Sequence, residues 1–305
     1  ARAVVEAHRR HGDRRNRAKS RLKVVVANQG GRGFAETLLG ILRERQVAGL
    51  EKLSIPASPT PAIVPAFLDG QAIIPQRQPD LHTVRVLIRR AELSVAQGRE
   101  LCRLAEVFGN GEVMFTNRQN IELRNVPGAH VANLLADLES AGFATAGHER
   151  LPDVVACVGT TMCRMAVADT TKAYRLIVDD LGAYPDLWEQ VGPLKINLTG
   201  CPNNCANSWI ADIGLRGRRI RDDATQASVE GFTILVGGSL AGAGRIAIPI
   251  LDVGMEQTVP ASLAILETYR GQRLNKTEAF ADFVVRVTPE GLKAFLPSPY
   301  SGKKP

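Results

Sequence analysis

The sequence predicts an α+β protein in which mixed sheets are packed with helices. Segments with apolar residues at helical spacing alternate with short segments in which apolar and polar residues alternate, as they do in strands. The chain has 305 residues and is 45% hydrophobic, which is enough to form more than one hydrophobic core. No window is long and apolar enough to cross a bilayer, so no contact with a membrane is expected.

The first part of the chain shows two helical patterns around a short apolar segment, residues 23–27, that suits a strand. The basic residues between Arg9 and Arg21 are expected on a solvated helix face. Prolines recur between residues 50 and 79 and periodicity is weak there, so this stretch is predicted to be a connector.

A compact unit is predicted next. Residues 82–89 alternate like a strand, 94–109 have helical spacing, 111–126 suit a pair of strands, and 129–142 suit a second helix that ends at Gly142. This order favours an open sheet with helices on one face.

The remaining sequence predicts a helix over 164–182, a half-buried strand over 194–200 and a strand over 229–238 that runs into a glycine-rich loop. That loop contains GAGRIA (242–247), which matches a dinucleotide fingerprint, but Pro249 follows too closely for the required helix. A weak internal repeat links residues 4–38 with 264–296. Each copy suggests a helix, an Asn-basic pair, an apolar strand and a glycine-led helix, so a duplicated architecture is predicted.

Four of the five cysteines form two close pairs, with five residues between Cys157 and Cys163 and three between Cys201 and Cys205. Structural zinc sites and thioredoxin-like redox pairs use a two-residue gap, which neither pair has. A [4Fe–4S] cluster needs four converging thiolates and tolerates varied spacing, so these four are predicted to bind one. Cys102 lies at helical spacing and is predicted to be a buried packing residue.

Five cysteines are too few for a disulfide scaffold in a chain of this length, which favours a reducing, cytoplasmic location. The formal net charge of +7 suits nucleic acid, an anionic cofactor or a small anion, and charge alone does not choose among them.

The segment TGCPNNCANSWIADIGLRG (199–217), preceded by the C-x5-C pair, resembles the siroheme and [4Fe–4S] signature of the nitrite and sulfite reductase family. VEGFTILVGG (229–238) and LAEVFGNGEVMFTNRQNIELRNV (104–126) also resemble that family, and most closely the C-terminal half of its ferredoxin-dependent nitrite reductases. The first 48 residues resemble the segment that closes the first half of such enzymes. The resemblance implies one half of a pseudo-duplicated siroheme reductase, with the N-terminal half missing.

The resemblance also implies roles for the cysteine loops. Cys157, Cys163, Cys201 and Cys205 match the four cluster ligands. Cys205 matches the cysteine that also ligates the siroheme iron, and Asn203 matches a residue that lies against the siroheme. The implied domains are the end of the first repeat with a linker (1–60), a ferredoxin-like reductase half-domain (61–150), and a domain that binds the cluster and siroheme (151–305).

Three further residues are candidates for the site. Arg118 lies in a T-x-R-Q segment, where it either binds a siroheme carboxylate or is a solvated arginine at a strand end. Lys195 and Asn197 share the polar face of the strand before Cys201 and face either the haem or water. Arg118 and Lys195 are the candidate catalytic residues, and Arg118 and Asn197 the candidate cofactor ligands beside Cys205 and Asn203.

The resemblance implies a reductase that uses siroheme and a [4Fe–4S] cluster, with reduction of nitrite to ammonia favoured. Reduction of sulfite to sulfide, a precorrin-3B synthase-like reaction, and an electron-relay subunit that holds only the cluster are the alternatives. The expected partners are a small inorganic anion and an electron donor such as ferredoxin or a flavoprotein. An anionic substrate and the siroheme carboxylates account for the positive charge, so no nucleic acid is expected.

Overall fold

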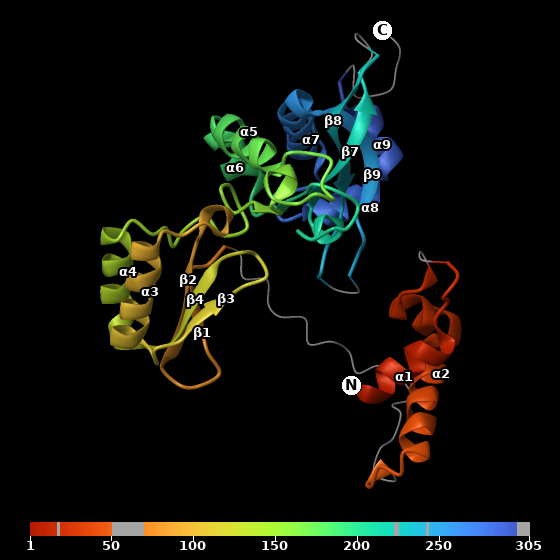
Figure 1. Cartoon of the computed structure of the whole chain (residues 1–305). Coiled ribbons are helices and arrows are strands. Elements are labelled where there is room, and N and C mark those ends of the chain that lie inside the picture. The colour runs from red at the N-terminus through yellow and green to blue at the C-terminus, as the bar shows by residue number, and fades with distance from the viewer. Residues whose placement is uncertain (17–18, 51–69, 223–225, 242–243, 298–305) are drawn as a thin grey trace. The chain divides into compact units, whose positions relative to one another are not determined.

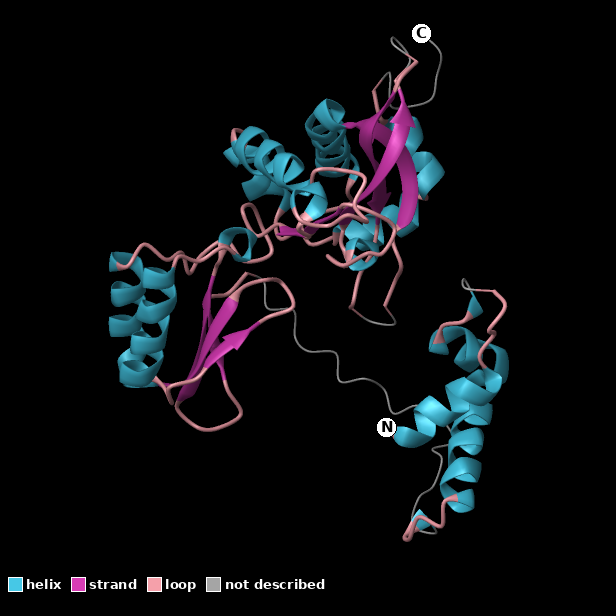
Figure 2. Ribbon diagram, in the orientation of Figure 1, coloured by secondary structure: helices cyan, strands magenta, loops and turns pink. Residues whose placement is uncertain are grey.

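A computed structural model describes residues 1–16, 19–50, 70–222, 226–241 and 244–297. The chain divides into two units, Ala1–Val64 and Pro65–Pro305, and the larger unit contains two sheets (Figures 1 and 2). Most of the predicted connector, and the first two residues of GAGRIA, lie outside the described residues. Within the predicted connector, Ile73–Pro75 forms strand β1 and is part of a sheet, so the connector is shorter than predicted. Among the described residues, no helix is both long and apolar enough to span a membrane.

The first unit consists of helices α1 (Arg2–His11) and α2 (Leu22–Glu44), which pack through Ala3, Ala7 and Ile41. The predicted strand over residues 23–27 is wrong, because these residues form the first turns of α2. Valine is enriched in strands, but this preference depends on context, and here the valines belong to a longer helical segment in which Val25 is buried. The solvated helix face is limited to Arg9 and Arg10, since α1 ends two residues after Arg9.

The first of the two sheets in the larger unit is four-stranded and antiparallel, with strand order β1-β2-β4-β3. Its remaining strands and its two helices are β2 (Leu81–Val86), β3 (Val113–Phe115), β4 (Ile121–Pro127), α3 (Val95–Phe108) and α4 (Val131–Ser140). Both helices lie on one face of this sheet (Figure 1). Their apolar side chains, including Leu104 and Leu134, pack against Val84 and Leu123 of the sheet. The predicted open sheet with helices on one face is confirmed.

Cys102 is exposed, so the prediction that it is a buried packing residue is wrong. Helix α3 buries Leu101, Leu104 and Ala105. Cys102 directly follows Leu101 in the sequence and lies outside this buried face. Helical spacing shows that a residue belongs to a helix, but a residue next to a buried position points about 100° away from it.

A five-stranded mixed sheet, in the order β5-β6-β7-β8-β9, forms the rest of the larger unit. Its strands are β5 (Val155–Ala156), β6 (Ile196–Thr199), β7 (Ile213–Arg221), β8 (Ser228–Val236) and β9 (Ile248–Gly254). Strands β5, β6 and β7 are parallel, and the other pairs are antiparallel. The helices that pack with it are α5 (Thr170–Gly182), α6 (Pro185–Val191), α7 (Thr258–Gln272), α8 (Phe280–Val287) and α9 (Pro289–Phe295).

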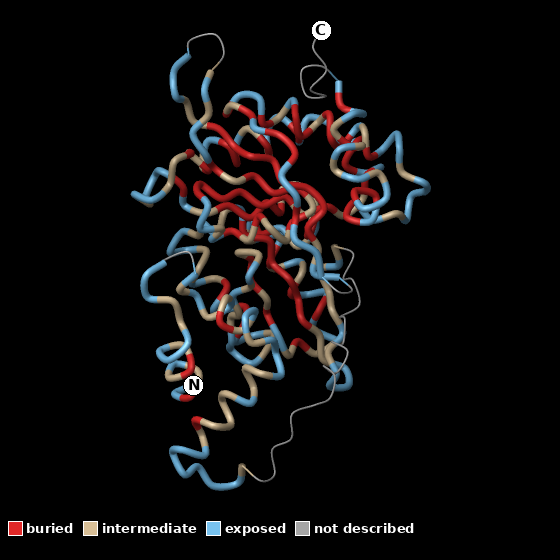
Figure 3. Tube along the Cα trace, turned by 90° about the vertical axis from the view of Figure 1, so that its right-hand side faces the viewer, coloured by how far each residue is buried: buried red, intermediate tan, exposed pale blue. Residues whose placement is uncertain are grey.

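The α+β class with mixed sheets and packed helices is confirmed, and Figure 3 shows in red the buried stretches of the chain. Strand β6 differs from the prediction of a half-buried strand. All four of its residues are buried, including Asn197 and Thr199. A strand between two parallel neighbours is covered on both faces, so its polar residues are enclosed with the apolar ones.

The internal repeat is visible in the backbone, but its apolar segments are helices and not strands. The C-terminal copy consists of α7, α8 and α9, and the N-terminal copy of α1 and the two parts of α2. Gly30 separates the two parts of α2 with φ 72° and ψ 160°, and Thr288 separates α8 from α9 with φ 62° and ψ 157°. The two copies therefore share a break between two helical parts with nearly the same backbone conformation.

Candidate functional site

The two cysteine loops follow neighbouring parallel strands. Cys157 comes directly after β5, and Gly200 and Cys201 come directly after β6. The carboxyl ends of adjacent parallel strands lie at one edge of a sheet, where binding sites of α/β sheets commonly form. The Cys157 amide donates to Leu198 O at 3.0 Å, and the Gly200 amide donates to Cys157 Sγ at 3.1 Å. The first cysteine thus lies beside the backbone that leads to the third.

The chain after Cys163 also returns to Gly200. The Cys163 amide donates to Gly159 O at 3.0 Å, which closes a turn around the 3-10 segment Gly159–Thr161. The Val167 and Ala168 amides then donate to Gly200 O at 2.8 and 3.3 Å. Both amide and carbonyl of Gly200 therefore bond to the loop that carries the first cysteine pair.

The loops meet through glycine backbones. A β-carbon on Gly200 would lie 3.2 Å from Gly159 Cα and 3.0 Å from Ala168 O, which is closer than side chains normally pack. Gly159 has φ +56°, a left-handed conformation that glycine adopts without strain. Larger residues would separate the two loops.

The second cysteine pair lies in the loop after β6, and a side chain of β6 bonds the backbone of this loop. Asn197 Nδ2 donates to Ala206 O at 2.8 Å and to Asn207 O at 3.2 Å. Cys201 is buried, whereas Cys205 and Asn203 are exposed. Asn197 thus fixes the chain directly after Cys205, and it is buried and not open to water, while its role toward a cofactor stays a prediction.

The four cysteines of this corner are the ligand type that an iron–sulfur cluster needs. All five cysteines are free thiols, and the four predicted ligands lie in the two connected loops. Asn197 Oδ1 and Thr199 Oγ1 are buried without a hydrogen-bond partner in the protein. Within the described part of the chain, no three Cys, His, Asp or Glu side chains form a ready metal-binding group. The ligand assignment therefore stays a prediction, which the shared corner and the amide directed at a sulfur favour.

Arg118 is not a solvated strand-end arginine. Its side chain is 14% exposed, and its Nε lies 2.9 Å from Asp153 Oδ2. Lys195 is half-buried, and its backbone amide donates to Asp212 Oδ2 at 2.9 Å. The roles of Arg118 and Lys195 toward a substrate or cofactor stay predictions.

Three residues near the first cysteine were not predicted: Gln119, Asp153 and Thr170. Gln119 bonds both backbone groups of Ala156, and Thr170 Oγ1 donates to Cys157 O at 2.5 Å. A signal was present in the sequence, since Arg118, Gln119 and Asn120 are three consecutive polar residues at a strand end. Their partners could not be identified without the tertiary structure.

Asp212 is the acidic residue near the site whose pKa is shifted most from its ordinary value. Burial raises its pKa to about 6, although the Lys195 amide and the charges of Lys195 and Arg118 act in the opposite direction. Its carboxyl is therefore partly protonated near neutral pH.

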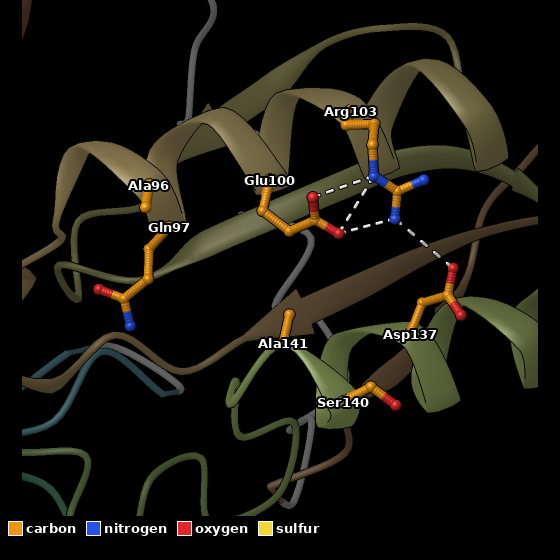
Figure 4. Close-up of a pocket in the computed structure, with 7 residues that line it drawn as sticks. All are labelled: Ala96, Gln97, Glu100, Arg103, Asp137, Ser140 and Ala141. Carbon is orange, nitrogen blue, oxygen red and sulfur yellow. Dashed lines mark hydrogen bonds and ion pairs between the residues drawn. The ribbon is translucent and has the colours of Figure 1, made fainter.

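A groove of about 440 Å³ between α3 and α4 is not part of this site (Figure 4). Arg103 bridges Glu100 at 2.6 Å and Asp137 at 3.7 Å along it, and all three side chains are partly exposed. The groove contains no cysteine. The residues that line it are Ala96, Gln97, Glu100, Arg103, Asp137, Ser140 and Ala141.

Comparison with known families assigns both sheet regions. Residues 74–141 match the nitrite/sulfite reductase ferredoxin-like half domain, and residues 148–304 match the nitrite and sulphite reductase 4Fe-4S domain. The second match alone covers more than half of the chain.

Curated relatives have both activities in their names. A ferredoxin–nitrite reductase of Synechococcus elongatus is 32% identical over 79% of this chain and 44% of its own length. A sulfite reductase [ferredoxin] of Mycolicibacterium paratuberculosis is 32% identical over 78% of this chain and 41% of its own length. The chain spans about half the length of the curated relatives it matches.

Solved structures agree with this fold. The structure of the Mycobacterium tuberculosis NirA protein superposes with a TM-score of 0.77 and 28% identity, over 95% of this chain and 52% of that one. A dissimilatory sulfite reductase I matches with a TM-score of 0.58 at 15% identity, which shows the fold alone. The two connected cysteine loops, the half domain beside them and these matches together show that the chain belongs to the nitrite and sulfite reductase family.

Proposed function

We propose that this chain forms the C-terminal half of a reductase that uses a [4Fe–4S] cluster and siroheme to reduce a small oxyanion. The observation that carries the proposal is the hydrogen bond from the Gly200 amide to Cys157 Sγ, which joins the two cysteine loops inside the family's 4Fe-4S domain. The proposed ligands are Cys157, Cys163, Cys201 and Cys205. The proposed division of the chain is 1–60, 61–150 and 151–305.

The protein's own contribution is to hold and polarise these ligands. The bound cofactors would supply electrons one at a time to a single bound anion. The Gly200 amide stabilises negative charge on the Cys157 sulfur, and such bonds raise the reduction potential of a cluster. The exposed Cys205 and Asn203 are open to a tetrapyrrole, which agrees with the proposal that Cys205 also ligates the siroheme iron.

Nitrite is the favoured substrate, with ammonia as the product. Support comes from the resemblance of residues 199–238 to ferredoxin-dependent nitrite reductases and from the relative in Synechococcus elongatus. Sulfite is the second candidate, because sulfite reductases match this chain at the same identity. The proposed partners are ferredoxin or a flavoprotein as electron donor and the N-terminal half of the enzyme, and the proposed location is the cytoplasm.

The test is anaerobic purification of the chain from cells that make siroheme, followed by visible spectroscopy and turnover assays with a reduced dye. We expect a Soret band with a second band in the red, and faster consumption of nitrite than of sulfite. Cys205→Ser should lose the haem band and much of the cluster absorbance. Cluster absorbance without a haem band would favour the electron-relay alternative, and oxygen-dependent tetrapyrrole turnover would favour the precorrin-3B synthase-like one.

A further inference from the structure

We infer that Gln119 is a positioning residue for the first cluster cysteine, acting through the backbone of Ala156. The inference deepens the proposed function and rests on it only for the identity of the cluster. Gln119 lies in the β3–β4 turn of the ferredoxin-like half domain, and Ala156 is the last residue of β5 in the 4Fe-4S domain.

The two bonds of Gln119 imitate the pairing of a neighbouring strand. Gln119 Nε2 donates to Ala156 O at 2.8 Å, and Ala156 N donates to Gln119 Oε1 at 3.0 Å. Strand β5 is at the edge of its sheet and pairs only with β6 among the described strands. The side-chain amide therefore satisfies the donor and acceptor of the edge residue that precedes Cys157, and it restricts the direction in which the chain enters the cysteine loop.

The turn that carries Gln119 is itself fixed. The Thr116 amide donates to Asn120 O at 2.9 Å, and the Asn120 amide donates to Thr116 Oγ1 at 3.1 Å. Gln119 has φ +62°, a left-handed conformation that side chains other than glycine and asparagine rarely adopt. A residue held in such a conformation indicates that its surroundings select it, and here the selected contact is Ala156.

Arg118 and Asn120, on either side of Gln119, bind the same segment. Arg118 donates from Nε to Asp153 Oδ2 at 2.9 Å and from Nη2 to Asp153 O at 2.6 Å. Asn120 Nδ2 donates to Asp153 Oδ1 at 2.9 Å, while its Oδ1 accepts from the Ile88 amide. The Asp153 side chain is 2% exposed. These three consecutive side chains, which we call the 118–120 clasp, hold residues 153–156 at both ends.

The clasp completes the set of contacts around Cys157. The cysteine's amide bonds Leu198, its carbonyl accepts from Thr170, and its sulfur accepts from Gly200. All of these partners belong to the 4Fe-4S domain, whereas the two bonds of Gln119 come from the half domain and end on Ala156, the residue directly before Cys157. The half domain therefore restricts the position of a proposed cluster ligand through the backbone of the residue before it.

The first test uses the full chain without iron. Gln119→Met keeps the side chain's length and removes both hydrogen bonds, so the Ala156 amide should exchange with deuterium roughly five- to tenfold faster. The Gly237 amide, which donates to Asp212 O at 2.9 Å, serves as the internal reference. Gln76→Met is the matched control, since Gln76 Nε2 donates to Thr83 Oγ1 at 3.0 Å in the same half domain, away from the cysteines. An Ala156 exchange rate unchanged in Gln119→Met would overturn the inference.

The second test uses the chain with a reconstituted cluster. We expect Gln119→Met and Gln119→Glu to shift the cluster's reduction potential and its electron paramagnetic resonance spectrum, and to shorten about fivefold the half-life of its absorbance in chelator. Gln76→Met should change none of these. If the wild type takes up a cluster and Gln119→Met matches it in all three properties, the positioning role is wrong. If the wild type takes up no cluster, the proposed function fails, and the exchange result still decides the contact.

Discussion

The backbone amide of Gly200 donates a 3.1 Å hydrogen bond to the sulfur of Cys157. These residues are far apart in the sequence, and they meet because β5 and β6 are adjacent parallel strands that end at the same edge of the sheet. The bond places one cysteine of the first pair next to the residue that precedes the second pair. It is the contact on which the account of the site depends.

Thr170→Val should destabilise the larger unit by about 1–3 kcal/mol, because it leaves the Cys157 carbonyl without its donor inside the protein. Thr171→Val is the matched control. Its buried hydroxyl has no hydrogen-bond partner, so its replacement should be neutral or stabilising. Urea unfolding of both variants measures the difference, and equal effects of the two would contradict the assigned role of Thr170.

Gly200→Ala should cost about 1–3 kcal/mol, because the new methyl group would press on Gly159 Cα and Ala168 O. Gly98→Ala is the control, since no atom lies within 4 Å of its added carbon and alanine favours the helix interior by about 1 kcal/mol. Thermal unfolding should lower the melting temperature of the first variant and raise that of the second. A stable Gly200→Ala would show that the loops are not in close contact.

Removing one partner of the buried ion pair between Arg85 and Glu149 should lower the stability more than replacing both partners with apolar residues. Their Nη2 and Oε1 atoms lie 2.6 Å apart, and both side chains are less than 10% exposed. Glu149→Gln leaves a buried charge unpaired and should cost about 3–5 kcal/mol. The double variant Arg85→Met with Glu149→Leu should cost much less. A double-mutant cycle in urea measures the coupling, and additive losses would rule out a direct pair.

Asp212→Asn should change how stability depends on pH. Because burial raises the pKa of Asp212 to about 6, its contribution to stability is fully present below the unfolded-state value near 4 and is lost as the pH rises through 6. The stability of the wild type relative to Asp212→Asn should therefore fall between pH 4 and pH 6.5. Urea titrations at several pH values test this, and a difference that rises with pH would contradict the sign.

Periodicity predicted most of the larger unit. The strand over 82–89, the helix over 94–109 and the strand pair over 111–126 appear as β2, α3, β3 and β4, and the apolar face is clearest in α3 and β4. It failed at the valines of α2 and at Phe280–Val287, where short apolar runs suit a strand and a buried helix equally well.

The sequence indicated the candidate site through its cysteines, but it did not indicate the residues that contact the cysteine loops. Spacing and flanking glycines indicated the four proposed ligands. The contacts of Asn197, Gln119 and Thr170 join residues from separate elements, and these pairings exist only once β5, β6 and α5 are assembled. A polar residue in a strand is usually predicted to face water. Asn197 is buried because its strand has a neighbouring strand on each side, which the sequence does not show.

The most direct test of the account is the iron and sulfide content of the chain after anaerobic reconstitution, together with its electron paramagnetic resonance spectrum when reduced. We predict about four iron and four sulfide ions per chain, as a [4Fe–4S] cluster requires. This content should be lost in Cys157→Ser and kept in Cys102→Ser, because Cys102 lies exposed on α3. A wild-type chain that retains no sulfide, or equal losses in the two variants, would contradict the cluster at this corner.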